Sequence, residues 1–272
     1  MTHTNFSAPG KAILAFAMLI SVQGISQPKI SLTADIWEKQ EEWDVRGRQG
    51  FKFKERLSFG QFSTYKVDRS WTKESSWTIG TSRRTLDVPQ GTNVISYDHI
   101  NKRQTLRFAA LSPSGETADV YAASKVKYNE LRIGEGNGWN SFSVDMGNLF
   151  RESSNNLFYV QIYLDGAQQP WQLVLDNGKS QTKPGKYVGY LYGPDGVYYQ
   201  LKPITHIQGK NGKSQRIIAG SVGFEILDAD GVGIAAVSTL DNGKVYFSKG
   251  LRPQERFLME NLCAAILLQE QI

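Results

Sequence analysis

The sequence predicts an all-β protein with one helix at its C-terminal end. Three observations lead to this fold class. Short apolar and aromatic runs alternate with turn sequences along most of the 272-residue chain, a pattern typical of antiparallel strands. No Pro- or Ser-rich linker and no internal repeat interrupts this alternation. The final stretch, residues 256–272 (RFLMENLCAAILLQEQI), is strongly apolar and has helical rather than strand character.

The first 26 residues have the layout of a secretory signal peptide. Lys11 precedes residues 12–22 (AILAFAMLISV), in which a single serine is polar, and Gly24 and Ser26 occupy positions −3 and −1 of a cleavage before Gln27. The apolar run is too short to span a bilayer. It also lacks the helical period of polar positions that a buried helix at a domain edge would show. We therefore expect export, either to the periplasm or out of the cell.

Residues 27–272 are expected to form a single β-rich domain. The expected strands are residues 29–37, 50–59, 62–68, 106–111, 118–123, 141–144, 157–164, 171–175, 187–192, 197–201, 216–218, 223–227, 233–240 and 245–248. Asp-Gly and Asn-Gly turns between many of them tolerate positive φ and close hairpins. About a dozen strands at this spacing predict an antiparallel sandwich or barrel, with residues 70–92 as a long loop.

Charge and cysteine content exclude several classes of protein. The formal net charge is +5 and the pI about 9.1, without a Lys- or Arg-rich block. A nucleic-acid partner is therefore not expected, whereas a mild attraction to anionic surfaces is. Cys263 is the only cysteine, so the chain has no internal disulfide. Its apolar surroundings predict a buried and inert thiol.

Motifs for catalysis or metal binding are missing from the sequence. His99 and His206, the two histidines after the signal peptide, stand in unrelated polar stretches. The Asp-Ala-Asp-Gly sequence at residues 228–231 resembles the start of a calcium loop, but a strand pattern follows it, so we expect a hairpin turn. The adjacent acids Glu41 and Glu42 are expected to be solvated. We expect no enzymatic activity, no catalytic residue, no cofactor and no metal ligand.

One cluster of cations and aromatic residues is a candidate ligand-binding site. Its residues are Lys66, Arg69, Trp71, Lys73, Trp77, Arg83 and Arg84. Such mixtures bind anionic, sugar or aromatic ligands through charge and stacking. In the alternative interpretation, Trp71 and Trp77 are core residues and the basic side chains only solvate the surface.

The C-terminal segment predicts a helix from about Pro253 to Gln269. Pro253 suits the first turn of a helix, and Glu255 suits its positive end. Residues 262–268 are apolar on every side, and a helix of this kind is buried. Three side chains are expected to be fully buried: Leu262, Cys263 and Ile266. The segment is shorter than the ~20 apolar residues that span lipid, so we do not expect an integral membrane protein.

The last part of the sequence also resembles a known family. Residues 223–269 (GFEILDADGVGIAAVSTLDNGKVYFSKGLRPQERFLMENLCAAILLQ) look like the end of domains with the tubby-like fold, which includes scramblase-like and LURP-one-like domains. The resemblance implies an antiparallel β-barrel of about twelve strands, closed so that no sheet edge remains, with the apolar helix in or against its core. Members of the family bind phosphoinositides or act at phospholipid membranes. The basic residues that hold phosphoinositides are not identifiable in this sequence.

These observations predict a non-enzymatic β-barrel module of the cell envelope or the secreted fraction. Its expected partner is anionic lipid or another envelope component. Two alternatives stay open: a hydrolase acting on sugar or lipid in the envelope, and a carbohydrate-binding β-sandwich. A concave site with two titratable groups within hydrogen-bond reach would favour the hydrolase. A flat aromatic strip would favour sugar binding.

Overall fold

The fold was obtained as a computed structural model. It describes residues 29–33, 36, 39–48, 56–70, 95–97, 105–126, 131–133, 156–182, 187–209, 211–218 and 220–269. The expected signal peptide and the expected strand at residues 141–144 lie outside the described residues, as do most of the expected strand at 50–59 and most of the expected loop at 70–92.

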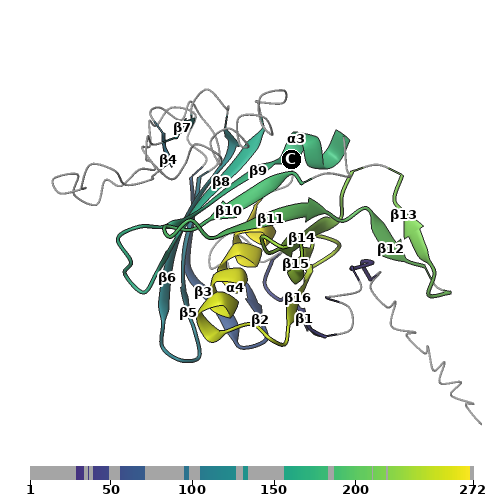
Figure 1. Ribbon diagram of the computed structural model, residues 1–272. Helices are drawn as coiled ribbons and strands as arrows, with labels where there is room; N and C mark the ends of the chain where they lie inside the picture. Colours follow the sequence, from purple (N-terminus) through teal and green to yellow (C-terminus); the bar gives the residue numbers. More distant parts are fainter. Residues whose placement is uncertain are drawn as a thin grey trace, which may run out of the picture.

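Within the described residues, twelve strands form one sheet in the order β1-β16-β15-β14-β11-β10-β9-β8-β6-β5-β3-β2 (Figure 1). The strands of this sheet are β1 (Gln40–Asp44), β2 (Ser58–Phe59), β3 (Phe62–Ser70), β5 (Thr105–Leu111), β6 (Thr117–Val126), β8 (Leu157–Leu164), β9 (Trp171–Asp176), β10 (Gly189–Tyr192), β11 (Tyr198–Pro203), β14 (Gly223–Leu227), β15 (Gly233–Ser238) and β16 (Lys244–Ser248). Every neighbouring pair in it is antiparallel. Two small ribbons pair β4 (Ile95–Tyr97) with β7 (Leu131–Ile133) and β12 (His206–Gln208) with β13 (Ser214–Arg216).

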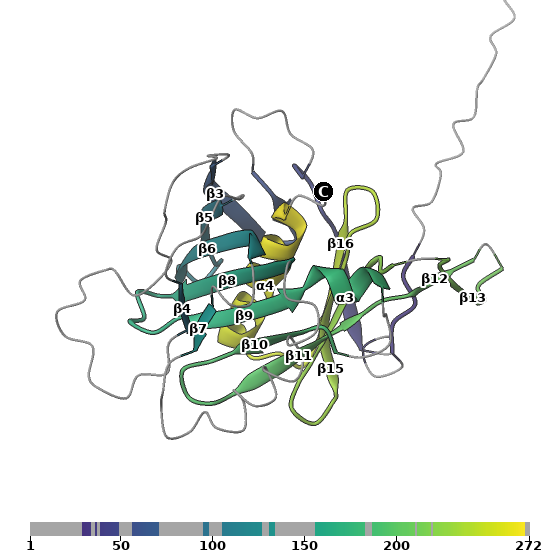
Figure 2. The same cartoon turned by 90° about the horizontal axis from the view of Figure 1, so that it is seen from above.

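The two end strands of the sheet meet and nearly close it into a barrel. Arg46, just after β1, and Ser58, at the start of β2, form an isolated antiparallel bridge. The Arg46 amide donates to the Ser58 carbonyl at 2.8 Å, and the Ser58 amide donates to the Arg46 carbonyl at 3.0 Å. The sheet therefore curls around on itself, as the view from above shows (Figure 2). The predicted antiparallel barrel of about twelve strands is confirmed, and the sandwich alternative is wrong.

Strand alternation separates the inside of the barrel from the outside. On β5, the side chains of Leu106, Phe108 and Ala110 join the central core, whereas Arg107 and Leu111 are exposed. The same period of two runs along β6. Adjacent strands therefore place their apolar residues inside and their polar residues on the outer face.

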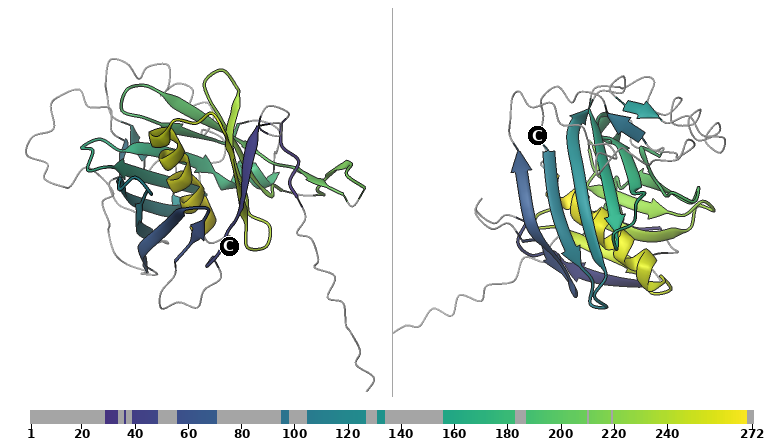
Figure 3. Two further views of the ribbon diagram at one scale, coloured as in Figure 1. Left: turned by 90° about the horizontal axis from the view of Figure 1, so that it is seen from below. Right: turned by 90° about the vertical axis from the view of Figure 1, so that its left-hand side faces the viewer.

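The helix α4 (Pro253–Leu268) runs through the barrel (Figures 1 and 3). Leu262 and Cys263 are 0% exposed and Ile266 is 2% exposed, so the predicted burial of the helix is confirmed. Pro253 begins the helix, where its missing N–H leaves no intrahelical bond unmade. Several small side chains face the interior, where they let the helix approach the strands: Ala110, Ala118, Ala122, Ala235, Ala264 and Ala265.

The described residues of the N-terminal segment, 29–33 and 36, pack on the outside of the barrel and do not form the strand expected at residues 29–37. In its described part, only Ile30 makes a strand-like contact, an isolated bridge to Ile207. Ile30 and Ile36 are fully buried against Ala236 and Tyr246, whose side chains face away from α4. The alternating pattern therefore reflects burial on a sheet surface rather than incorporation into the sheet.

Two further expectations are wrong. The acids Glu41 and Glu42 are not merely solvated charges, because both lie in β1 and pair with cations, and the Glu42 side chain is only 23% exposed. The Asn-Gly sequence after β9 does not close a tight hairpin but begins a short helix, α3 (Asn177–Thr182). The Asp176 carboxylate accepts the Lys179 amide at 2.8 Å and caps this helix. The 228–231 sequence does form the expected hairpin turn, in which Asp228 Oδ1 accepts two backbone amides.

Candidate functional site

Two residues of the predicted binding cluster are described by the structure. Lys66 is exposed and Arg69 is half-buried, and both lie on β3. The other five predicted residues lie outside the described residues: Trp71, Lys73, Trp77, Arg83 and Arg84. The site can therefore be built only around the part of the cluster on β3.

A β-bulge at Lys66 shapes the outer face of β3. Tyr65 pairs with Ala109 and Asp68 with Arg107, so Lys66 and the residue after it stand opposite a single residue of β5. Lys66 has a φ of 52°, in the left-handed region that few non-glycine residues adopt. Without the bulge, residues three positions apart on a strand would face opposite sides. The bulge turns both Tyr65 and Asp68 toward the outside.

A depression of about 400 Å³ opens on this outer face. Three neighbouring strands contribute to it: β3, β5 and β6, whose outer surface faces the viewer in the right-hand view of Figure 3. Its lining residues are Tyr65, Lys66, Asp68, Arg107, Ala109, Thr117, Ala118 and Asp119. Two cations and two carboxylates therefore border one small concave surface.

The charged groups of the depression are held by their neighbours. Arg107 Nη2 lies 3.8 Å from Asp119 Oδ1. The Arg107 guanidinium carbon lies 5.0 Å from the centre of the Tyr121 ring, a cation–π distance. Lys66 Nζ lies 5.7 Å from the centre of the ring of Tyr65, a residue that is 37% exposed. These contacts favour one orientation of Arg107, whose side chain is 44% exposed, and leave polar atoms and an aromatic ring accessible to solvent.

A buried polar network continues the same outer face toward β8 and β9. The Tyr121 and Tyr163 rings meet edge to face at 5.9 Å. Gln161 Nε2 donates to the Tyr159 hydroxyl at 3.0 Å, and that hydroxyl donates to Gln172 Oε1 at 2.7 Å. Tyr159 is 0% exposed, and burial raises the pKa of its hydroxyl well above the ordinary value. This satisfied network orders the outer face of β8 and β9, next to β6.

Other chemically active groups do not converge with the depression. Cys263 is fully buried beside α4's other core residues, and burial raises the pKa of its thiol, as its inert role predicts. His206 lies on β12, where its Nδ1 is 3.0 Å from the Thr205 hydroxyl. Within the part of the chain that the structure describes, no cluster of three or more His, Cys, Asp or Glu side chains could hold a metal ion. Among the same residues, no helix has both the length and the apolar content to cross a membrane.

Most of the depression was not identified from the sequence. Arg107 and Asp119 alternate with apolar residues on their strands, and this alternation predicts that each side chain lies on the outer face of the sheet. Their contact depends on the register of β5 with β6, in which Ala109 pairs with Asp119 and Arg107 with Tyr121. A strand sequence alone does not specify that register.

Comparisons with protein-family models, with curated proteins and with solved structures find no match to this sequence. The resemblance of residues 223–269 to tubby-like domains therefore stays a prediction.

Proposed function

We propose that this protein is a non-enzymatic, exported binding module whose binding surface is the depression on the outer face of β3, β5 and β6. The observation that carries the proposal is the convergence of Lys66, Asp68, Arg107 and Asp119 around one concave surface. The depression combines hydrogen-bond donors, acceptors and an aromatic residue, and a few convergent polar groups on a concave surface are typical of ligand sites.

The position of α4 supports an outer rather than an inner site. In many β-barrels the interior is a ligand cavity. Here the interior is filled by the helix, whose residues Phe257 to Leu268 are all buried. A ligand of this barrel therefore binds its outer face or its rims.

The fixed geometry of the depression also supports binding. Arg107 contacts both Asp119 and Tyr121, and such contacts reduce the side-chain freedom that a bound ligand would remove. The signal-peptide layout of residues 1–26 supports export. If export occurs with cleavage, the secreted or periplasmic form begins at or near Gln27, which N-terminal sequencing measures. An intact Met1 on protein recovered outside the cytoplasm would contradict this part of the proposal.

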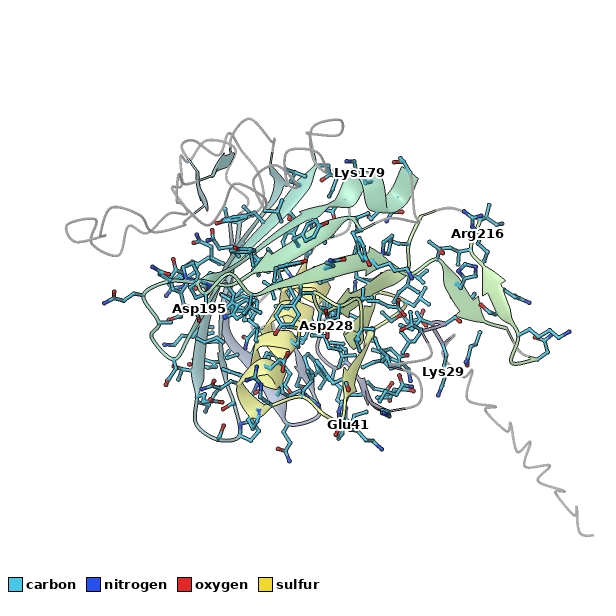
Figure 4. All side chains as sticks on the ribbon, viewed as in Figure 1. Lys29, Glu41, Lys179, Asp195, Arg216 and Asp228 are labelled. Carbon is cyan, nitrogen blue, oxygen red and sulfur yellow. The ribbon has the colours of Figure 1, made fainter. Side chains whose placement is uncertain are left out.

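Filling the depression tests the binding surface. Ala109 pairs with Tyr65 on one side and Asp119 on the other, so Ala109→Leu places a larger apolar group between these two residues. Gln215→Leu is the matched control, because Gln215 is an exposed strand residue on β13, in the ribbon that projects from the opposite side of the molecule (Figures 1 and 4).

The measurement is cosedimentation of the protein with two kinds of probe. These are insoluble cell-wall polysaccharides and vesicles of phosphatidylglycerol in phosphatidylcholine. We expect the unmodified protein and Gln215→Leu to bind at least one probe, and Ala109→Leu to bind it at least tenfold more weakly. Equal binding by both variants, or no binding of the unmodified protein to either probe, would overturn the proposal.

A further inference from the structure

We infer that the depression binds a neutral, polyhydroxylated ligand, namely a glycan, rather than an anion. This inference rests on the proposed function of the depression as a binding surface, and it specifies the chemistry of the ligand. Four features of the depression support it: its charge balance, its mixture of donors and acceptors, its exposed ring and its rigidity.

The charge balance opposes an anionic ligand. Among the lining residues that the structure describes, Lys66 and Arg107 contribute two positive charges, and Asp68 and Asp119 contribute two negative charges. One of the cations, Arg107, already lies 3.8 Å from a carboxylate oxygen of Asp119. A phosphate group in the depression would approach the carboxylates of Asp68 and Asp119, and like charges that lie close together repel. Proteins that hold phosphate instead supply clustered Arg, Lys or backbone N–H donors.

The mixture of donors and acceptors suits hydroxyl groups. A hydroxyl both donates and accepts hydrogen bonds, an ionised carboxylate only accepts, and Lys and Arg only donate. Neighbouring hydroxyls of a sugar can therefore donate to Asp68 or Asp119 and accept from Lys66 or Arg107. Residues directly opposite on adjacent strands lie about 5 Å apart, which places Asp68 and Arg107, a directly opposed pair, within reach of a single sugar unit.

The exposed Tyr65 ring supplies an apolar platform. The residue is 37% exposed and lines the depression. Sugars present flat patches of C–H groups, and an aromatic face covers such a patch without removing hydroxyls from their polar partners. Tyr65 and Asp119 both flank Ala109 on adjacent strands, so one ligand can contact the ring and the carboxylate at once.

The rigidity of the face favours a weakly held, uncharged ligand. Hydrogen bonds to neutral hydroxyls are individually modest, so a site made of them depends on preorganised groups. Here the bulge at Lys66 fixes the edge of β3, and the contact of Tyr121 with Tyr163 fixes the side near β8. A flexible basic patch would bind an anionic surface without either feature.

The experiment is affinity electrophoresis of residues 27–272, which measures how far a polysaccharide in the gel retards the protein. The gels contain one of four neutral soluble polysaccharides: dextran, xyloglucan, galactomannan or hydroxyethyl cellulose. We expect at least one polysaccharide to retard the protein, with less than a twofold change in affinity between low and high salt. Tyr65→Ala and Asp119→Asn should each weaken the retardation at least tenfold, and Tyr65→Phe should retain it, because stacking needs the ring and not the hydroxyl.

A second arm distinguishes a glycan from a lipid headgroup. Lys66→Asn removes the ammonium while an asparagine accepts the left-handed backbone. Lys213→Asn, at an exposed position beside β13, removes the same charge from the far side. One outcome would overturn the glycan inference but leave the proposed binding surface standing. In that outcome no polysaccharide retards the protein, whereas phosphatidylglycerol vesicles bind it, and this binding weakens with salt and in Lys66→Asn but not in Lys213→Asn. No binding to polysaccharide or vesicle, or binding unchanged by Ala109→Leu, would overturn both.

Discussion

Arg48 donates a hydrogen bond from its Nε to the carbonyl oxygen of Leu267, 3.0 Å away, and so binds the last turn of α4 from outside the helix. Its Nη1 also donates to the carbonyls of Thr239 and Asp241, at 2.9 and 3.2 Å. The last four carbonyls of a helix have no donor within it, and the last turn of α4 carries no basic residue of its own. A single guanidinium therefore joins the negative end of the helix to the loop after β15.

The first prediction concerns this contact. Arg48→Ala should lower the free energy of unfolding by roughly 2–3 kcal/mol, because charge-assisted hydrogen bonds to partly buried carbonyls are lost. Arg48→Lys should cause a smaller loss of the free energy of unfolding, because lysine keeps the positive charge but lacks the planar guanidinium with its several N–H donors. The measurement is urea unfolding followed by circular dichroism.

Arg46→Ala is the matched control for Arg48→Ala. The Arg46 side chain is exposed, and its barrel-closing hydrogen bonds are made by its backbone. It should change the urea midpoint little. If Arg46→Ala and Arg48→Ala unfold at the same urea concentration, water satisfies the end of α4 and the guanidinium does not stabilise it.

The parts of the fold that could be predicted from the sequence carry their own burial signal. Residues 262–268 of α4 are apolar on every side, and β8 is apolar except for Gln161, so the predicted bounds of both elements lie within about a residue of the observed ones. The strand β1 (QEEWD) carries no such signal. Its acids Glu41 and Glu42 acquire partners 215 and 202 residues away, at Arg256 and Lys244. Local sequence contains no information about contacts at that separation.

Part of the candidate site could also be predicted from the sequence, and part could not. Lys66 was predicted because cations and aromatic residues alternate around it. The bulge requires a positive φ at Lys66, and a lysine in the sequence gives no sign of such a backbone conformation. The contact of Arg107 with Asp119 depends on the register of β5 with β6. Both are products of the whole sheet rather than of any short sequence.

The second prediction concerns the helix inside the barrel. Leu262→Ala and Ile266→Ala should each destabilise the protein by roughly 2–5 kcal/mol, because each leaves a cavity in a packed core. Leu111→Ala, at a leucine that is 49% exposed on β5, should change the melting temperature far less. Thermal unfolding gives all three values.

Labelling and truncation test the same helix independently. Cys263 is 0% exposed, so it should react with a thiol reagent only as the native protein opens. Deletion of residues 257–272 should prevent cooperative folding. Immediate labelling of Cys263, together with a truncated barrel that melts near the original temperature, would mean that the helix docks on the barrel without being part of its core.

The third prediction concerns the buried carboxyl of Glu225. Burial raises its pKa, and the Thr33 amide and Lys202, at 2.6 and 4.0 Å, only partly oppose this. Because the folded state then binds the proton more tightly than the unfolded state, this group destabilises the fold as the pH rises from the unfolded value of about 4.3 through the folded pKa. Glu225→Gln keeps an acceptor for the Thr33 amide. It should raise the urea midpoint at neutral pH and have little effect below about pH 4.

The fourth prediction has the opposite sign and concerns Glu42. Burial alone would raise its pKa, but hydrogen bonds from Lys244 at 2.6 Å and Lys29 at 3.2 Å lower it below the ordinary value. The stability that Glu42 contributes is therefore present above the unfolded value of about 4.3 and is lost as the pH falls through the folded pKa. Glu42→Gln should lower the urea midpoint at neutral pH, and the difference from the unmodified protein should vanish in acid. A general effect of acid on the barrel would move both glutamine variants in the same direction. We therefore expect the urea midpoints of Glu42→Gln and Glu225→Gln, measured in the same series of titrations, to change with pH in opposite directions. This result would agree with a Glu42 carboxylate that is paired with lysines and a Glu225 carboxylate that is desolvated beneath the N-terminal segment.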